Sequence, residues 1–463
     1  MLASMRGRSL LVICAIALVH AAAYIVHQRP DWNVAWTDQA GYQRLGEVLA
    51  RSGTFTRYPG SPVFVPEVIR TPGYPVFVAL VYRLFGIGNQ MALVIVQAFV
   101  FAGLCVIVFG LARRITTERV ALLAALIAAL FSPFPYFGAL ALTELWTTFI
   151  AALAILACLR AVQSGRTATY AIAGVLFSLT TLVRPAFVLL PFFLAVAVPL
   201  FVRDQRQRRA LRGWAALSVA ALITLAPWFT YNYIHLGRVT LSPAGGIGRG
   251  LWEAAWQGRW PGRVQAALTD VATTTVVPVE LDRRADAIAA ETGLDPAPMR
   301  TYVREWRTIH DLWDTPTDPM ERVAARIAAD QAYFDAAITH MREDPGGHVW
   351  RRLTRAPFFL WAADIPIRHT LINEIPPLVI RGVWLLQVLL LGVAALGGVH
   401  LVRSGRRLEA AILILPLIYV TAVHLPLLCE ARQSLPVKPL VIVLAAIGIT
   451  SLGTAGRKTP ASP

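Results

Sequence analysis

Charged residues are scarce in this chain, and this scarcity excludes most soluble classes of protein. Of its 463 residues, 15% are Asp, Glu, Lys or Arg, whereas 56% are hydrophobic. A soluble domain of this length could not bury so many apolar side chains. The composition therefore predicts an integral membrane protein.

Cysteine is also rare, with four residues in the whole chain. Cys14, Cys105 and Cys158 fall inside long apolar runs, and only Cys429 lies outside them. This distribution excludes a disulfide framework and a site in which several thiolates bind a metal ion.

Several motifs are absent as well. Transporters usually have internal repeats and charged residues at the middle of their membrane spans. The two halves of this chain show no repeat, and its apolar runs carry almost no charge at mid-depth. No Gly-rich nucleotide loop and no groove-reading motif accompanies the net charge of +16, so nucleic acid is not an expected partner. Anionic lipid headgroups of the bilayer are the expected partner of the basic residues.

What the sequence does contain is a series of apolar runs long enough to approach or cross about 30 Å of hydrocarbon. Because a backbone in lipid must satisfy its own hydrogen bonds, these runs predict helices. We expect an all-α integral membrane protein with about ten transmembrane helices. The candidate spans are residues 9–27, 89–111, 120–138, 140–159, 170–183, 186–202, 214–233, 378–402, 410–427 and 436–453.

The loops between these runs indicate the orientation. Connections such as "ARRITTER" and "VRDQRQRRALRG" are rich in arginine, whereas "SPFPYFGALAL" has no charge. By the positive-inside rule both termini are predicted to be cytoplasmic, in the inner (plasma) membrane. We predict three parts: an N-terminal transmembrane module (1–233) with a first outer loop (28–88), an extracytoplasmic domain (234–377), and C-terminal transmembrane helices with a tail (378–463).

The two outer segments have distinct patterns. From Asp38 onward, apolar residues recur at helical spacing, which predicts a short amphipathic helix in the membrane interface. The stretch "YPGSPVFVPEVIRTPGYP" has too much Pro and Gly for a helix, and "VFVALVYRLFG" is expected to be half-buried. The second outer segment is predicted to form a small, mostly helical domain.

Five ionisable residues from distant parts of the chain are expected in one layer, at the outer ends of the spans: Asp38, Arg70, Glu144, Arg184 and Arg432. Each has a simpler interpretation taken alone. An acid that opens a helix is usually an N-cap, and an interfacial arginine usually reaches for the headgroups. Their convergence is the informative observation.

The order of several short motifs resembles a known family. After Asp38 come "RTPGYPVFVALVYRLFG", "LTELWTT", "TLVRP", "PWFTYNY" and "EARQSLPVKPLVIVLAAIG". Together they are similar to the lipid-carrier-dependent glycosyltransferases of the GT-C superfamily, kin to protein O-mannosyltransferases and aminoarabinose transferases. The resemblance covers about residues 9–260 and 350–455.

This resemblance implies transfer of a sugar from a polyprenyl phosphate to a hydroxyl acceptor on the extracytoplasmic face. The family's first-loop aspartate falls on Asp38, which is then the general base, with Glu144 as a second catalytic residue that orients the sugar or acceptor. The remaining residues carried over are phosphate-binding Arg70, Arg184 and Arg432, and substrate-binding Tyr42, Tyr74 and Asn232.

The sequence departs from the family at three points. Tyr231 precedes Asn232 where many members have Arg, and Arg432 is followed by Gln433 where many have Tyr. Some relatives pair two acids in the first loop around a divalent ion, but Thr37 precedes Asp38 here. We predict no metal ligands; a loosely held divalent ion assisted by Glu67 and Glu144 stays open.

Two other interpretations stay open at the level of sequence. A polyprenyl-linked substrate transporter or flippase would bind the same phosphate without cleaving the donor. A protein whose outer loops only dock a partner would leave the convergence of charges unexplained. The sequence does not identify the sugar or the acceptor.

Overall fold

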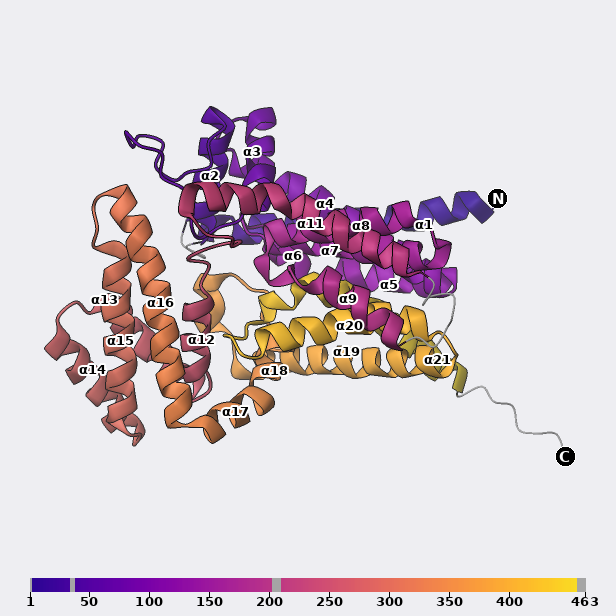
Figure 1. Cartoon of the computed structure of the whole chain (residues 1–463). Helices are drawn as coiled ribbons and strands as arrows, with labels where there is room; N and C mark the ends of the chain where they lie inside the picture. The colour runs from indigo at the N-terminus through magenta and orange to yellow at the C-terminus, as the bar shows by residue number, and fades with distance from the viewer. Residues whose placement is uncertain (1, 34–37, 202–209, 456–463) are drawn as a thin grey trace.

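The computed structural model describes residues 2–33, 38–201 and 210–455, and within these ranges it contains helices and no strands. Eleven of these helices form a bundle of roughly aligned rods (Figure 1). They are α1 (Leu2–Gln28), α4 (Gln90–Ile115), α5 (Glu118–Leu130), α6 (Pro133–Gly138), α7 (Glu144–Ser164), α8 (Thr167–Val183), α9 (Leu190–Phe201), α11 (Leu211–Leu236), α19 (Pro377–Arg403), α20 (Arg407–His424) and α21 (Lys438–Ala455).

The predicted all-α membrane class is confirmed, but the count of about ten spans is not. Among the described residues, seven helices are long and apolar enough to cross a membrane. The predicted runs at 170–183 and 186–202 form shorter apolar helices. The run at 120–138 is divided between α5 and α6, because Pro133 begins a new helix at a position where its missing N–H costs nothing.

Close helix packing holds the bundle together. α8 packs on α11, and α19 packs on α21. A Cβ atom at Gly174 would collide with the backbone carbonyl of Leu217, and one at Gly397 would collide with that of Leu444. Small residues at such crossings let membrane helices approach closely, where dispersion contacts replace the hydrophobic effect.

The segment predicted to be the first outer loop, residues 28–88, contains the amphipathic helix expected from its sequence. α2 (Asp38–Ser52) is amphipathic and packs on α3 (Gly73–Phe85), and residues 54–72 between them contain no helix. Backbone bonds tie this connection to the chain after α11, since the Ala244 N–H donates to the carbonyl of Val68 at 2.9 Å. Both helices lie at the end of the bundle where residues 247–354 also lie (Figure 1).

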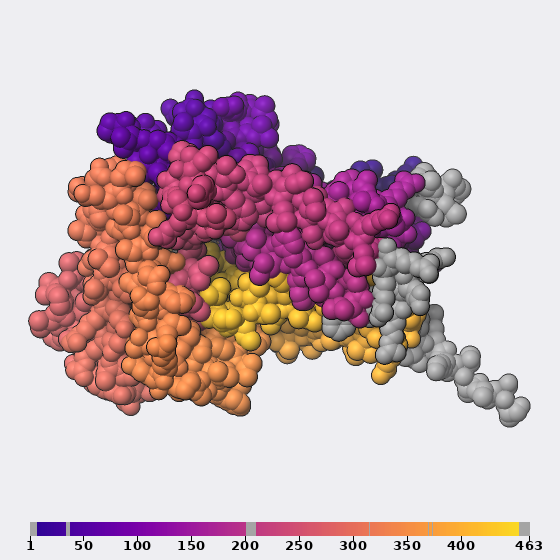
Figure 2. All heavy atoms as spheres, viewed as in Figure 1, coloured from indigo at the N-terminus to yellow at the C-terminus, as the bar shows by residue number. Residues whose placement is uncertain are grey.

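Residues 234–377, predicted to be the second outer segment, are mostly helical, as predicted. Its helices are α12 (Ile247–Trp256), α13 (Gly262–Thr274), α14 (Pro278–Thr292), α15 (Pro296–Asp314), α16 (Pro319–Glu343), α17 (Pro345–Thr354) and α18 (Ala356–Trp361). Trp252, Trp256 and Tyr302 are central to a separate hydrophobic core. Figure 2 shows the orange helices of this domain at one end of the molecule, beside the yellow C-terminal helices.

A buried charge pair joins two helices of this core. His340 of α16 contacts the Glu305 carboxylate of α15 at 2.9 Å, and the same carboxylate accepts the indole N–H of Trp252 at 2.7 Å. Burial lowers the pKa of His340, but the Glu305 and Glu343 carboxylates outweigh it and raise that pKa above 6.5. The stabilisation is therefore complete below pH 6.5 and is lost as pH rises through the raised pKa.

Glu305→Gln is accordingly expected to destabilise the protein by about 1–3 kcal/mol at pH 6, because the buried His340 loses its charged partner. The difference from wild type should shrink as the pH rises through the His340 pKa. Thermal unfolding at several pH values measures it. Glu291→Gln, at an exposed position of α14, is the matched control. A loss of stability in Glu305→Gln that does not change with pH would contradict the account.

Candidate active site

Five separate elements bring the five predicted ionisable residues together. Asp38 is the first residue of α2, Arg70 precedes α3, and Glu144 is the first residue of α7. Arg184 follows α8, and Arg432 lies in a short 3₁₀ turn, η4 (Ala431–Gln433). Ion pairs link all five into one cluster.

Asp38 sits between two arginines. One carboxylate oxygen, Oδ1, accepts from Nη2 of Arg70 at 2.7 Å, and Oδ2 lies 3.6 Å from Nη1 of Arg432. The Asp38 side chain is 45% exposed, whereas that of Arg70 is 9% exposed. An N-cap role alone would not orient the carboxylate toward two guanidinium groups from distant segments.

Glu144 is the buried acid of the cluster, with 2% of its side chain exposed. Its Oε1 lies 3.7 Å from Nη2 of Arg184 and 3.8 Å from Nη1 of Arg432. Arg184 adopts an extended backbone because Pro185 follows it, which ends α8 at this point. A buried carboxylate is tolerated here because two cations lie within ion-pair distance.

Sequence reasoning missed Glu430, a third acid of the cluster. Its Oε2 accepts from Nε of Arg432 at 2.7 Å, and its side chain also forms a capping box with Gln433. Burial lowers the pKa of Arg432, but the carboxylates of Glu430, Glu144 and Asp38 raise it overall. The spacing of Glu430 from Arg432 in "EARQ" was the available signal. Gln433 thus caps this turn.

The position of Arg70 is set by the loop before α3, which the Glu67 carboxylate holds by hydrogen bonds. Both oxygens of the buried Glu67 carboxylate accept from Arg57, and Oε1 also accepts the backbone N–H groups of Ile69 and Arg70, at 2.8 and 3.0 Å. The Arg70 guanidinium stacks over the Tyr42 ring, 4.5 Å from its centroid. Glu67 therefore holds the loop, and Tyr42 forms the floor beneath the cation.

Tyr74 and Asn232 make different contacts from those expected of substrate ligands. Tyr74 is fully buried against Tyr42, and its hydroxyl donates to Gln97 at 2.9 Å. The side-chain amide of Asn232 donates to the backbone carbonyl of Thr240 at 2.6 Å. Among the described interactions, none joins Asn232 to the ion-paired cluster.

A further ion pair on α12 faces this cluster. Arg249 pairs with Glu253 at 3.0 Å, one helical turn apart. Burial raises the pKa of Glu253, and Arg249 opposes this shift. The pair interacts electrostatically with Asp38, Glu430 and Arg432. The sequence placed these residues in a glycine-rich, tryptophan-bearing stretch, and nothing there pointed to this cluster.

The described residues contain no group of three or more His, Cys, Asp or Glu side chains arranged to hold a metal ion. Glu67, considered above as an aid to a loosely held ion, already binds Arg57 and two backbone N–H groups. The cluster is instead built from carboxylate–guanidinium pairs, and a guanidinium donates directional hydrogen bonds to carboxylate or phosphate oxygens.

Comparison with known proteins gives one family match. Residues 69–231 match the family model described as dolichyl-phosphate-mannose-protein mannosyltransferase. This stretch includes Arg70, Glu144 and Arg184, but neither Asp38 nor Arg432. A comparison with curated protein sequences finds no match.

Solved oligosaccharyltransferase structures share the fold at low sequence identity. The apo crystal structure of the Archaeoglobus fulgidus oligosaccharyltransferase matches with a TM-score of 0.52 and 14% identity, covering 97% of this chain and 51% of that one. The same organism's oligosaccharyltransferase AglB, in complex with an inhibitory peptide and a dolichol-phosphate, matches at 0.51 and 15%, covering 98% and 52%. Apo ArnT from Cupriavidus metallidurans matches at 0.40 and 16%, covering 98% and 81%.

The chain therefore spans about half the length of the oligosaccharyltransferases that it matches. Its helical architecture and family match define a multi-pass membrane protein with the GT-C fold. This result confirms the resemblance that the order of motifs predicted.

Proposed function

We propose that this protein is a membrane glycosyltransferase that moves a monosaccharide from a polyprenyl-phosphate donor to a hydroxyl acceptor on the extracytoplasmic face. One observation carries the proposal: Asp38, half exposed, is held between Arg70 and Arg432 in a GT-C fold. A dolichol-phosphate is bound in one structure of similar fold, which supports a lipid phosphate as part of the donor.

Asp38 is the proposed general base. Its carboxylate takes the proton of the acceptor hydroxyl as the acceptor oxygen bonds to the anomeric carbon of the sugar. The bond from that carbon to the phosphate oxygen breaks at the same time, and polyprenyl phosphate leaves with the electron pair. Proton transfer of this kind typically contributes about 10²–10⁴-fold to a rate.

The arginines are proposed to stabilise the departing phosphate. In the resting cluster, Asp38, Glu144 and Glu430 balance Arg70, Arg184 and Arg432. When Asp38 accepts a proton it becomes neutral, and the positive charge of Arg70 and Arg432 is then available to the phosphate as its negative charge develops. Cations already in place cost no reorganisation at that moment.

Glu144 has a supporting role in this proposal. It holds Arg184 and Arg432 in position from beneath and orients the sugar or the acceptor. Tyr42 lies under Arg70, where its ring keeps the guanidinium from turning away from Asp38. The proposed location is the inner (plasma) membrane, with both termini cytoplasmic and the cluster outside.

A small change beneath Arg70 tests this geometry without removing a charge. A Cβ atom at Gly41 would lie 2.6–2.8 Å from three atoms of the Arg70 guanidinium. Gly41→Ala should displace that group from Asp38 and slow transfer by roughly 10–100-fold. The unfolding temperature should not fall, because Ala is a better helix former than Gly. Unchanged transfer would mean that the observed Arg70 position is not needed; Ala40→Ser, at an exposed neighbouring position, is the control.

Mass spectrometry of the cell envelope tests the proposed function as a whole. Glycolipids and glycoproteins from cells with and without the gene are compared, together with cells that carry Asp38→Asn. We expect one monosaccharide to be missing from one class of acceptor in both mutant strains and restored by the wild-type gene. Identical envelopes in all strains, with the protein expressed, would overturn the proposal.

A further inference from the structure

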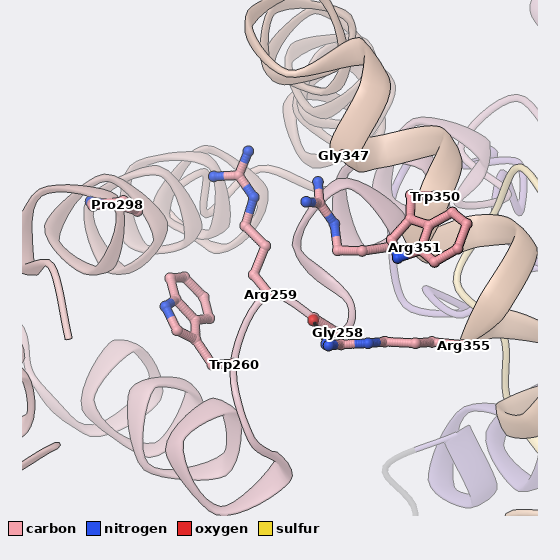
Figure 3. Close-up of a pocket in the computed structure, with 8 residues that line it drawn as sticks. All are labelled: Gly258, Arg259, Trp260, Pro298, Gly347, Trp350, Arg351 and Arg355. Carbon is pink, nitrogen blue, oxygen red and sulfur yellow. Dashed lines mark hydrogen bonds between the residues drawn. The ribbon is translucent and has the colours of Figure 1, made fainter. Parts of the chain in front are cut away.

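The outer domain contains a second concentration of arginines, away from the ion-paired cluster. A cavity of about 360 Å³ opens between the turn after α12, the start of α15, and α17. Arg259, Arg351 and Arg355 line it together with Trp260 and Trp350, and no acidic side chain is among its lining residues. Figure 3 shows the guanidinium groups of Arg259 and Arg351 next to each other on one side.

These arginines are only partly neutralised by the protein. Nη1 of Arg351 pairs with Asp344 at 2.9 Å, whereas its Nε and Nη2 atoms are buried and have no hydrogen-bond partner in the described structure. Arg259 stacks over the Trp256 ring at 4.6 Å. Burial lowers the pKa of Arg259 and the neighbouring Arg351 lowers it further, and the carboxylates of Asp344, Glu343 and Glu305 offset only part of this shift.

The geometry of Arg351 suits an oxyanion. Nε and one terminal nitrogen form the edge of a guanidinium that binds two oxygens of a phosphate at once. Both atoms are covered in this structure, so an anion accepts from them only after a small rotation of the Arg351 side chain toward the cavity. Because a buried N–H group without a partner is costly, that rotation removes a penalty as well as adding attraction. Arg355 is held at the cavity wall by the backbone carbonyl of Gly258.

Apolar residues beside the cavity indicate that such an anion belongs to a membrane lipid. Val349, Trp350 and Leu353 of α17 are 54%, 67% and 59% exposed. α17 leads through α18 back to the bundle (Figure 1). An exposed apolar strip next to arginines, with a Trp at its centre, is typical of a helix that lies in the headgroup layer of a membrane.

The cavity is also joined to the segment that carries Arg432. Gln257 donates from Nε2 to the carbonyl of Cys429 at 2.7 Å, and Arg352 donates from Nε to the carbonyl of Leu425 at 2.7 Å. Nη1 of Arg352 donates to Oε1 of Gln257 at 2.8 Å. Two walls of the cavity, the turn after α12 and helix α17, are therefore anchored directly to the chain that leads into η4.

We propose that this cavity binds the phosphate group of an anionic membrane lipid of the outer leaflet, with the lipid chains lying along the exposed face of α17. The site is separate from the proposed donor phosphate site. Its existence does not depend on the transfer reaction, so binding alone tests it.

The test is lipid binding to the purified full-length protein, measured by native mass spectrometry. The probes are short-chain phosphatidylglycerol and phosphatidylcholine with the same chains, each with and without inorganic phosphate as competitor. Arg259→Gln/Arg351→Gln removes two cavity charges. Arg283→Gln/Arg304→Gln removes two charges of surface ion pairs in the same domain and is the matched control.

Wild type and control should prefer phosphatidylglycerol, and the cavity variant should lose about 10–100-fold in affinity for it. Arg351→Lys keeps the charge but not the two-pronged edge, so its affinity for phosphatidylglycerol should lie between those of the wild type and the cavity variant. This single variant is the control for a folding defect in the double variant. Equal binding by all four proteins would overturn the site. Competition by inorganic phosphate without any preference for phosphatidylglycerol would overturn the assignment to a lipid.

Discussion

Asp38→Asn is expected to reduce transfer by about 10²–10⁴-fold while leaving the protein folded and in the membrane. The amide has nearly the same shape, but it cannot take a proton from the acceptor hydroxyl. It also leaves Arg70 and Arg432 with less negative charge, so donor binding should be kept or become tighter. The measurement is the rate of sugar transfer by purified protein at saturating donor, with donor affinity measured separately.

The control for this variant lies on the same helix. Glu47→Gln removes one negative charge from α2 at a position outside the ion-paired cluster, so it should transfer sugar at the wild-type rate. If Asp38→Asn retained most of the wild-type rate, Asp38 would be a helix-opening residue and nothing more.

Arg432→Gln is expected to have the second large effect, because Arg432 is shared by three acids. Transfer should fall by about 10²–10³-fold through loss of charge stabilisation at the phosphate. Stability should also fall, by about 3–5 kcal/mol, because Glu144 is 2% exposed and loses one of its two cations. Donor affinity should weaken here, in contrast to Asp38→Asn. Transfer assays, donor binding and thermal unfolding together measure these effects.

Arg432→Lys separates the two roles of this residue. An ammonium group keeps a positive charge beside Glu144, so most of the stability should return. It cannot reach Glu430, Glu144 and Asp38 together as the guanidinium does, so transfer should stay low. Full recovery of transfer in the lysine variant would show that charge alone matters and that the planar geometry of Arg432 does not.

The sequence was sufficient for the class of fold and for five members of the cluster. Asp38, Glu144 and Arg184 each stand at the end of a helix, where apolar runs and Pro185 fix the boundary. Charged residues at the outer ends of spans share one depth, and this depth is what brought the five into one hypothesis. Which residues of this layer form ion pairs depends on how the helices pack, and the hydrophobic periodicity of the sequence does not predict that packing.

Other parts needed the structure. Glu430 was visible in the sequence, but only the 3₁₀ turn at Ala431–Gln433 brings its carboxylate back onto Arg432. Arg249 and Glu253 reach the cluster because α12 is fixed by a backbone bond from Leu428 to the carbonyl of Gly250. The predicted run at 120–138 is not one helix, because apolar composition alone does not show that Pro133 begins a new one.

Tyr74 stays a predicted substrate ligand, and the sequence could not predict the contacts that its side chain makes. Its place in "RTPGYP" suggested a substrate ligand, yet the side chain is buried and its hydroxyl donates to Gln97, whose amide donates to the carbonyls of Gly138 and Leu140. A buried tyrosine hydroxyl needs such a partner. Its contacts in this structure support Tyr42 beneath Arg70.

The most direct test of the central claim is the fate of the donor in a reconstituted system. Purified protein is supplied with a polyprenyl-phosphate sugar labelled in both the sugar and the phosphate, together with an envelope extract as the source of acceptor. The account predicts free polyprenyl phosphate in amounts equal to the sugar transferred, and about 10²–10⁴-fold slower formation of both products with Asp38→Asn. Donor that stays intact would contradict it, and intact donor that is moved across the bilayer would identify a flippase.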